Sequence, residues 1–200
     1  MLHSHPVFDA LLSGTKALSV ALGFRDQATQ QHADRVVGLS QALGHACQLT
    51  LAELSLLRVA ATFHDVGKIG IPDRILHKPG RLDSDERNQM QLHSEFGERI
   101  VAASELDGAD SAARIIRHHH EHFDGRGYPD GLAGESIPMC SRIISVCDSY
   151  DAMGAARTYQ NTRSHRDIMA ILAEESGSKH DPAVVRAFSE LIGSNPYRIA

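Results

Sequence analysis

The sequence FHDVGKIGIPDRILHKPGRLDSDE occupies residues 63–86, where one predicted helix ends and another begins. The first of these helices opens at Thr50, which can form a capping box with Glu53. His64 and Asp65 therefore follow directly on a helix C-terminus. Adjacent side chains cannot share one helix face, but near a helix end an imidazole nitrogen and a carboxylate oxygen can meet on one cation. A His-Asp pair alone is more often a surface feature, so its meaning depends on the rest of the chain.

Two loops rich in glycine and proline, residues 67–82 and 124–138, interrupt the helical pattern. Ordered segments of this composition usually fold back over a site rather than link domains. We find no strand alternation, internal repeat or low-complexity tract. The sequence therefore predicts one domain over residues 1–200.

Helical periodicity dominates outside the two loops. Apolar residues recur at spacings of three and four, as at Val36, Leu39 and Leu43, and capping residues mark the helix starts. We expect helices at about residues 7–22, 28–47, 51–63, 83–103, 110–120 and 139–157, and two more that begin near 164 and 181. The predicted fold class is all-α, a single-domain helical bundle of about seven to nine helices.

Charge and cysteine content narrow the functional classes. The formal net charge of −5 argues against binding DNA or other nucleic acid through a broad basic face. Cys47, Cys140 and Cys147 are an odd number without a repeated CxxC spacing, which is typical of a reducing compartment. The N-terminus lacks the basic region of a signal peptide, and no apolar run is long enough to cross a bilayer. We expect a cytoplasmic protein without a membrane partner.

Histidine is the unusual residue, with 13 in the chain. His32 shares a predicted helix face with Val36 and Leu39, which directs its imidazole inward. His93 is one turn from Gly97, which leaves room beside its ring. Each of these histidines alone would more often be a hydrogen-bonded core residue than a metal ligand.

An aspartate and a histidine run extend this pattern. Asp148 lies within the apolar run 143–150, and a buried carboxylate needs either a salt bridge, to Arg142 or Arg157, or a metal ion. The sequence HHHEH at residues 118–122 stands at an expected helix end, directly before the second loop. Together these groups exceed what a core can satisfy by hydrogen bonds, so we favour a metal cluster.

Several long motifs in order resemble the HD-GYP domain family. They are the sequence of residues 63–86, HHEHFDGRGYPDGLAGESIP at 119–138 and SRIISVCDSYDAMGAARTYQ at 141–160. The resemblance runs from RDQATQQHADRV at 25–36 to HDPAVVRAF at 180–188, nearly the whole chain. Members of that family are bacterial hydrolases of cyclic di-GMP, with a helical fold and an iron- or manganese-type cluster.

The resemblance implies seven metal ligands: His32, His64, Asp65, His93, His119, His120 and Asp148. It makes Asp65 the bridge between two ions, with His32, His64 and Asp148 on one ion and the other histidines mainly on the second. His118 and His122 are then supporting or surface residues.

The resemblance also bears on the kind and number of ions. Two divalent ions are expected, iron or manganese by family and nickel or zinc also by ligand type. Some members hold a third metal through a glutamate where this chain has Ala28, which has no donor atom, so the sequence predicts a binuclear site.

The implied substrate, cyclic di-GMP, has anionic phosphodiesters that resist attack. Two metal ions neutralise that charge and supply a bridging hydroxide at neutral pH. Asp65 and Lys68 are the predicted catalytic residues. Lys68 would contact the scissile phosphate or assist the leaving group, although a lone loop lysine is usually only solvated.

Three further features complete the predicted substrate side. The resemblance puts Arg157 near the ligand phosphates, whereas the alternative is an arginine that interacts with the helix dipole. Tyr128, in the Gly-Tyr-Pro segment, either stacks on a guanine or bonds a phosphate. The same loop is equally consistent with a role in shaping the pocket and in binding signalling proteins.

Two alternative functions stay open. One is an HD phosphohydrolase that acts on another nucleotide or cyclic dinucleotide, and the other is a catalytically weak sensor or interaction module. Under the main hypothesis the product is linear pGpG, with onward cleavage to GMP less expected. The first predicted helix, at about residues 7–22, could be an N-terminal extension or a homodimer contact.

Overall fold

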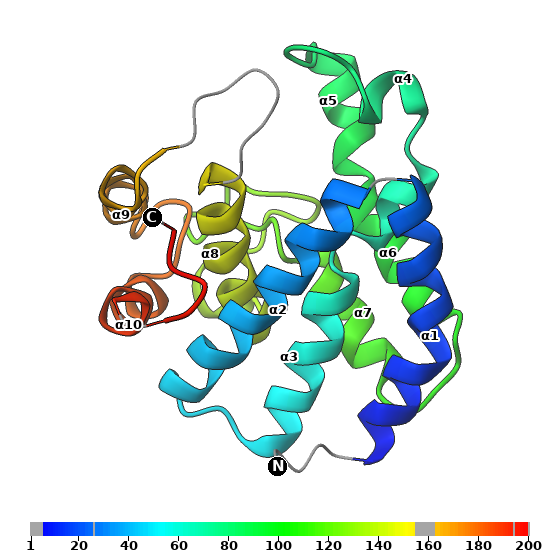
Figure 1. The fold of residues 1–200 in the computed structure, drawn as a ribbon, viewed down its shortest axis with the longest axis horizontal. Coiled ribbons are helices and arrows are strands. Elements are labelled where there is room, and N and C mark those ends of the chain that lie inside the picture. The colour runs from blue at the N-terminus through cyan, green and yellow to red at the C-terminus, as the bar shows by residue number, and fades with distance from the viewer. Residues whose placement is uncertain (1–5, 26, 155–162, 194, 200) are drawn as a thin grey trace.

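Helices make up the whole of the regular structure that we describe (Figure 1). The computed structural model describes residues 6–25, 27–154, 163–193 and 195–199. The α-helices in these ranges are α1 (Pro6–Arg25), α2 (Gln27–Ala46), α3 (Leu51–Phe63), α4 (Asp73–Leu76), α5 (Ser84–Gln91), α6 (His93–Ala102), α7 (Ala109–Arg117), α8 (Met139–Gly154), α9 (His165–Glu174) and α10 (Pro182–Ile192). Two 3₁₀ helices, η1 (Val66–Gly70) and η2 (Gly134–Ser136), lie in the loops. The predicted all-α class is confirmed.

The helix starts that the sequence predicts are confirmed by their caps. Thr50 and Asp83 each accept a hydrogen bond from the backbone N–H of a glutamate three residues on, and both complete a capping box. Ser164 caps α9, and Asp181 caps α10 with Pro182 in its first turn. Local side-chain chemistry therefore sets where these helices begin.

One predicted helix is divided in two. The sequence predicts a continuous helix over 83–103, but α5 ends at Gln91 and α6 begins at His93. The His93 ring Nδ1–H donates to the carbonyl of Met90 at 2.8 Å, and the Ser94 hydroxyl donates to that of Gln91 at 3.0 Å. Side chains that bond nearby carbonyls compete with the helical ladder. This break and the short α4 raise the number of α-helices in the described ranges to ten, above the seven to nine expected.

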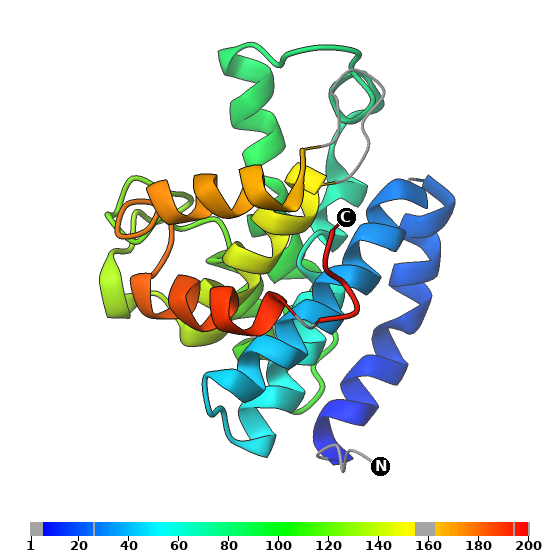
Figure 2. The same ribbon diagram turned by 60° about the vertical axis from the view of Figure 1, so that its left-hand side comes forward.

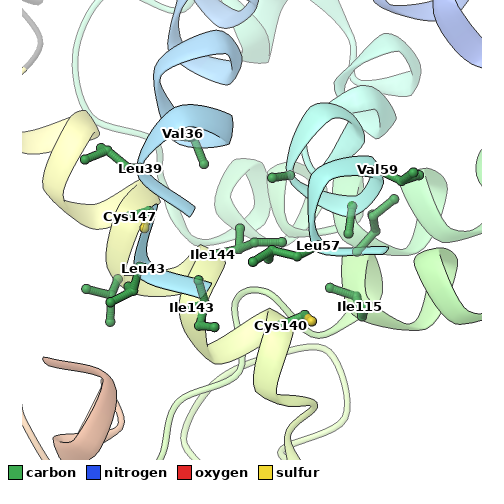
Figure 3. Close-up of a cluster of buried hydrophobic side chains, with 14 of the residues drawn as sticks. Val36, Leu39, Leu43, Leu57, Val59, Ile115, Cys140, Ile143, Ile144 and Cys147 are labelled. Carbon is green, nitrogen blue, oxygen red and sulfur yellow. The ribbon is translucent and has the colours of Figure 1, made fainter. Parts of the chain in front are cut away.

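The hydrophobic core lies between α2, α3, α7 and α8. Figure 3 shows the apolar stripe of α2, with Val36, Leu39 and Leu43, facing side chains of α3 and α8 such as Leu57 and Ile144. Each large apolar side chain buried in this way contributes roughly 1.5–3 kcal/mol. In Figures 1 and 2, α1 covers one flank of this layer and α9 and α10 cover the other.

The segment α4–α5 stands apart from this core. In both ribbon views it extends above the ends of α2 and α8 (Figures 1 and 2). None of the side chains of α5 is buried. The core helices, rather than α4 and α5, therefore provide the rigid frame that holds the predicted site residues.

No helix among the described residues has the length and apolar character needed to cross a membrane.

Candidate metal centre

The His-Asp pair lies where α3 ends and η1 begins. The His64 ring donates from Nδ1–H to the carbonyl of Ala61 at 2.8 Å. A carbonyl can only accept, so Nδ1 holds the ring proton and Nε2 keeps a lone pair. This side chain is only 1% exposed, and its Nε2 has no hydrogen-bond partner among the described residues. A buried acceptor left in this way is costly unless it binds something.

His93 and His119 repeat the arrangement of His64. Their Nδ1–H groups donate to the carbonyls of Met90 and Ile116, again three residues earlier, at 2.8 and 2.5 Å. Their Nε2 atoms lie 3.5 Å from each other. Burial lowers the pKa of His93, while burial and the neighbouring His64 and His93 lower the pKa of His119 to about 3. Both rings are neutral near pH 7, so two lone pairs face each other, an arrangement that a shared cation stabilises.

The seven predicted ligands come together as two groups joined by an aspartate. One group is His32, His64 and Asp148, the other is His93, His119 and His120, and within each the donor atoms lie within 4.8 Å of one another. Asp65 Oδ2 lies 3.5 Å from His64 Nε2, and Asp65 Oδ1 lies 3.6 Å from His93 Nε2. Each oxygen of one carboxylate thus faces a different group. The chemistry of this donor set fits two divalent cations.

His32 has carboxylate partners on both ring nitrogens. Its Nε2 lies 3.0 Å from Asp148 Oδ1, and its Nδ1 lies 2.7 Å from Asp151 Oδ2. Burial works to lower the pKa of His32, but the hydrogen bonds to Asp148 and Asp151 raise it to about 9. Burial likewise works to raise the pKa of Asp148, but the hydrogen bond and charge of His32 hold it well below its ordinary value. A cation bound by His32 and Asp148 would replace the proton that now joins them.

The salt-bridge alternative for Asp148 is partly excluded. Arg142, one of the two candidate partners, donates instead to Asp181 at 2.6 Å. Arg157, the other candidate and the predicted phosphate-binding residue, lies outside the described residues. Within the described residues, Asp148 pairs with His32.

Lys68 lies on η1 beside the two groups. Its ammonium lies 2.6 Å from Asp65 Oδ2. Burial works to raise the pKa of Asp65, but Lys68 and the nearby histidines hold it well below the ordinary range. Arg25, the last residue of α1, donates to the carbonyls of Lys68 and Ile69 and so fixes the backbone of η1. The predicted catalytic lysine is therefore held against the aspartate that joins the two groups.

Gly67 allows η1 to approach α6 closely. A Cβ at this position would lie 1.8 Å from the His93 carbonyl oxygen and 2.5 Å from the Gly97 nitrogen. The space that Gly97 leaves is filled by the Ile116 side chain, 2.9 Å from where a Cβ would lie, and by the Gly67 nitrogen of η1, at 3.5 Å. The lack of a side chain at Gly67 therefore lets the backbone that follows Asp65 pack directly against the backbone of His93.

Gly67→Ala is expected to destabilise the protein by about 3 kcal/mol or more, because both close neighbours are backbone atoms that cannot rotate away. Thermal unfolding measures the loss. Gly193→Ala is the matched control, since a Cβ at Gly193 meets no heavy atom within 4 Å. The control should change stability by less than about 0.5 kcal/mol. Equal melting temperatures for the two variants would contradict the close approach.

The second loop lies against the histidine run. Backbone N–H of Tyr128 donates to the carbonyl of His120 at 3.2 Å, and the two rings are 4.9 Å apart at 30°. Glu121, only 2% exposed, accepts the backbone N–H groups of Asp130 at 2.8 Å and Leu132 at 3.1 Å. A Cβ at Gly127 would lie 2.1 Å from the nitrogen of His122. Tyr128 therefore lies beside the second group of ligands, and Glu121 anchors the loop that contains it through the backbone N–H groups of Asp130 and Leu132.

His118 belongs to a separate cluster. Its Nε2 lies 2.8 Å from Asp130 Oδ2, and the donor atoms of His118, Glu121 and Asp130 are also within 4.8 Å of one another. Arg117 donates to both oxygens of Asp130 at 2.7 and 2.8 Å, so a permanent positive charge lies directly beside this carboxylate. His122 is half-buried near Lys179, and burial is the main cause that lowers its pKa. We interpret this cluster as a structural contact that holds the second loop, residues 124–138, in place.

Sequence reasoning missed Asp151, Arg35 and Glu121. Asp151 bonds His32 and also accepts two hydrogen bonds from Arg35, at 2.7 and 2.9 Å. A signal was present in the spacing, because Arg35 is three residues after His32 and Asp151 is three residues after Asp148. Only the packing of α2 against α8 brings the two pairs together (Figure 1).

A family model described as HD domain matches residues 16–184. The chain therefore belongs to the HD domain family, and the family prediction is confirmed. The family is one that binds divalent metal ions, in keeping with the two groups of donors described above.

Individual relatives refine this assignment. The chain is 37% identical over 183 residues to the Cyclic di-GMP phosphodiesterase of Thermotoga maritima, covering 92% of this chain and 50% of the relative. It is 38% identical over 173 residues to the 3'3'-cGAMP-specific phosphodiesterase 2 of Vibrio cholerae serotype O1, covering 86% and 33%. The chain thus spans from a third to a half of the length of these two relatives.

A solved structure shares the fold. The HDG"Y"P protein Bd1817 of Bdellovibrio bacteriovorus superposes with a TM-score of 0.68 at 20% identity, covering 94% of this chain and 60% of that one. At this identity the likeness shows the fold alone.

Proposed function

We propose that the chain is the catalytic domain of a metal-dependent phosphodiesterase that hydrolyses cyclic di-GMP to linear pGpG. The observation that carries the proposal is the position of Asp65, with one carboxylate oxygen toward each of two groups of metal-type donors. Relatives named cyclic di-GMP phosphodiesterases, 37% identical over 85–92% of the chain, support it.

Each side chain of the site then has a chemical role. His32, His64 and Asp148 would hold one cation, and His93, His119 and His120 the other. When bound, two cations supply charge neutralisation at the phosphodiester and a water of lowered pKa as nucleophile. The residues of the chain orient the ester for this chemistry.

Three residues form the proposed substrate side. Lys68 would bind the scissile phosphate, since its ammonium is already at the centre. Tyr128 would stack on a guanine, because its ring lies beside His120. Arg157 stays a prediction as a second phosphate ligand.

Iron or manganese is the proposed metal, with nickel or zinc compatible with the same donors. Two ions are proposed rather than three, because Ala28 offers no donor atom. Onward cleavage to GMP is accordingly not expected. The three free cysteines support a reducing compartment such as the cytoplasm. A homodimer through the first helix and a signalling partner at the second loop stay predictions.

A second substrate has a specific observation in its favour. Relatives that are 38%, 33% and 33% identical to this chain are named 3'3'-cGAMP-specific phosphodiesterases. That ligand has the same pair of phosphodiesters but carries one adenine in place of a guanine. The cations that these donors would hold act on the phosphates, which both ligands share. The donors therefore do not distinguish the two substrates.

Product chromatography on anaerobically purified, metal-analysed protein tests the function. We expect two metal ions per chain and conversion of cyclic di-GMP to pGpG. Parallel reactions contain 3'3'-cGAMP, cyclic di-AMP and a nucleoside monophosphate. Faster hydrolysis of 3'3'-cGAMP would make 3'3'-cGAMP, rather than cyclic di-GMP, the preferred substrate. Release of phosphate from the monophosphate alone would favour a general phosphohydrolase, and binding without turnover would favour a sensor.

A further inference from the structure

Four of the five histidines among the predicted ligands have an Nδ1 hydrogen-bond partner that the structure shows, and these partners differ in kind. His64, His93 and His119 each donate from Nδ1–H to a backbone carbonyl three residues earlier. His32 instead directs Nδ1 to the carboxylate of Asp151 at 2.7 Å. A carbonyl oxygen is a neutral acceptor, whereas a carboxylate is anionic. The hydrogen bond at His32 is therefore of a stronger, charge-assisted kind.

Asp151 is itself fixed in place. Arg35 Nε donates to its Oδ1 at 2.7 Å and Arg35 Nη2 to its Oδ2 at 2.9 Å. A two-pronged pair of this geometry sets both the position and the plane of the carboxylate. Because Arg35 and His32 lie one turn apart on α2 while Asp151 lies on α8, the arrangement also ties the two helices together at the site.

A carboxylate partner makes a histidine ring a stronger metal ligand. Donation from Nδ1–H to a carboxylate raises the basicity of the opposite nitrogen and fixes the ring orientation, both of which favour metal binding at Nε2. The His32 group also contains the carboxylate of Asp148, whereas the three donors of the His93 group are neutral imidazoles. A divalent cation is attracted more strongly by the first set of charges.

We infer that the two metal positions are unequal, and that the one formed by His32, His64 and Asp148 binds a divalent cation more tightly because the Arg35–Asp151 pair orients and polarises His32. The inference rests on the two-cation centre of the proposed function but not on the identity of the substrate. Arg35 and Asp151 are then positioning residues, which act through His32.

Titration of the chelator-stripped chain with Mn²⁺ tests this, with free Mn²⁺ followed by electron paramagnetic resonance. The native chain should bind one ion tightly and a second more weakly. Asp151→Asn keeps an oxygen near His32 but removes the charge, and it should weaken the tight step by about 10–100-fold. The weaker step should stay unchanged, because Asp151 acts on His32 rather than on the His93 group.

Asp181→Asn is the matched control. Asp151 and Asp181 are both 5% exposed, and each pairs with one arginine, Asp151 with Arg35 at 2.7 Å and Asp181 with Arg142 at 2.6 Å. Asp181 caps α10 and makes no hydrogen bond to His32 within the described structure. Its replacement should therefore lower the melting temperature without changing either Mn²⁺ step.

Arg35→Lys serves as a second variant if Asp151→Asn does not fold. Lysine keeps the positive charge beside Asp151 but loses the two-pronged contact that sets the plane of the carboxylate. The tight Mn²⁺ step should weaken by about tenfold, and the weaker step should again stay unchanged.

The outcomes separate this inference from the proposed function. Two equal Mn²⁺ steps in the native chain would overturn the inference, as would a tight step that neither Asp151→Asn nor Arg35→Lys changes. A chain that binds no Mn²⁺ would overturn both. Two unequal steps that respond to Asp151→Asn, without hydrolysis of any cyclic dinucleotide, would support the inference and overturn the proposed function alone.

Discussion

Asp65→Asn is expected to lower the turnover of cyclic di-GMP by at least about a thousandfold, since charge stabilisation by a metal centre is worth several kcal/mol. The two oxygens of Asp65 face different groups, at 3.5 Å from His64 Nε2 and 3.6 Å from His93 Nε2. Asparagine replaces one oxygen with an NH₂ group that cannot bind a cation and removes the negative charge. Product chromatography at saturating metal gives the rate, and metal analysis gives the number of ions retained.

Asp181→Asn again controls for the loss of a buried, ion-paired carboxylate. It should turn over substrate at close to the native rate, because Asp181 caps α10 and pairs with Arg142, and neither contact involves a predicted ligand. If Asp65→Asn retained two ions and more than a tenth of the native rate, Asp65 would not be the bridging residue. If signalling in cells survived the change although turnover was lost, the sensor alternative would gain.

Local signals made the helix starts predictable. A capping residue acts on backbone groups two or three positions away, so the sequence around Thr50 and Asp83 is enough to predict that a helix begins there. The same range of action explains the missed break after Gln91. The side chains that produce it, His93 and Ser94, are ordinary helix residues, and only their bonds to the preceding carbonyls reveal the break.

The convergence of the seven predicted ligands followed from motifs rather than from periodicity. Periodicity indicated that His32 and Asp148 face inward, but it left a salt bridge and a metal ion both open for Asp148. The structure supplies what the pattern lacked, since Arg142 is paired with Asp181 and the ring of His32 lies against Asp148. Whether these residues bind metal stays a prediction.

Residues that support the ligands were the hardest to predict. Asp151 and Arg35 lie 116 positions apart, and their pairing depends on how α2 crosses α8. Each helix alone shows only a charged residue one turn after a ligand, which is also typical of a solvated face. Glu121 posed the same problem, because its partners are backbone N–H groups of a loop whose path the sequence does not define.

Lys68→Met is expected to lower kcat for cyclic di-GMP by about a hundred- to a thousandfold, which is the usual effect of removing one group that stabilises developing charge. Methionine keeps most of the length of the side chain but has no charge. The chain should still hold two metal ions, because Lys68 is not among the donor groups. The reaction is followed by product chromatography over a range of substrate concentrations, so that kcat and KM are obtained separately.

A purely structural role of Lys68 makes a different prediction. Its ammonium lies 2.6 Å from Asp65 Oδ2, so it could act only by orienting that carboxylate. In that case Lys68→Met would weaken metal binding, and kcat would recover when Mn²⁺ is raised to saturation. Lys78→Met is the matched control, because Lys78 is also partly exposed and pairs with a carboxylate, Glu86, away from the centre. A low kcat that persists at saturating Mn²⁺ in Lys68→Met alone would support contact between the ammonium and the phosphate, since a lysine that only orients Asp65 would no longer be needed once both ions are bound.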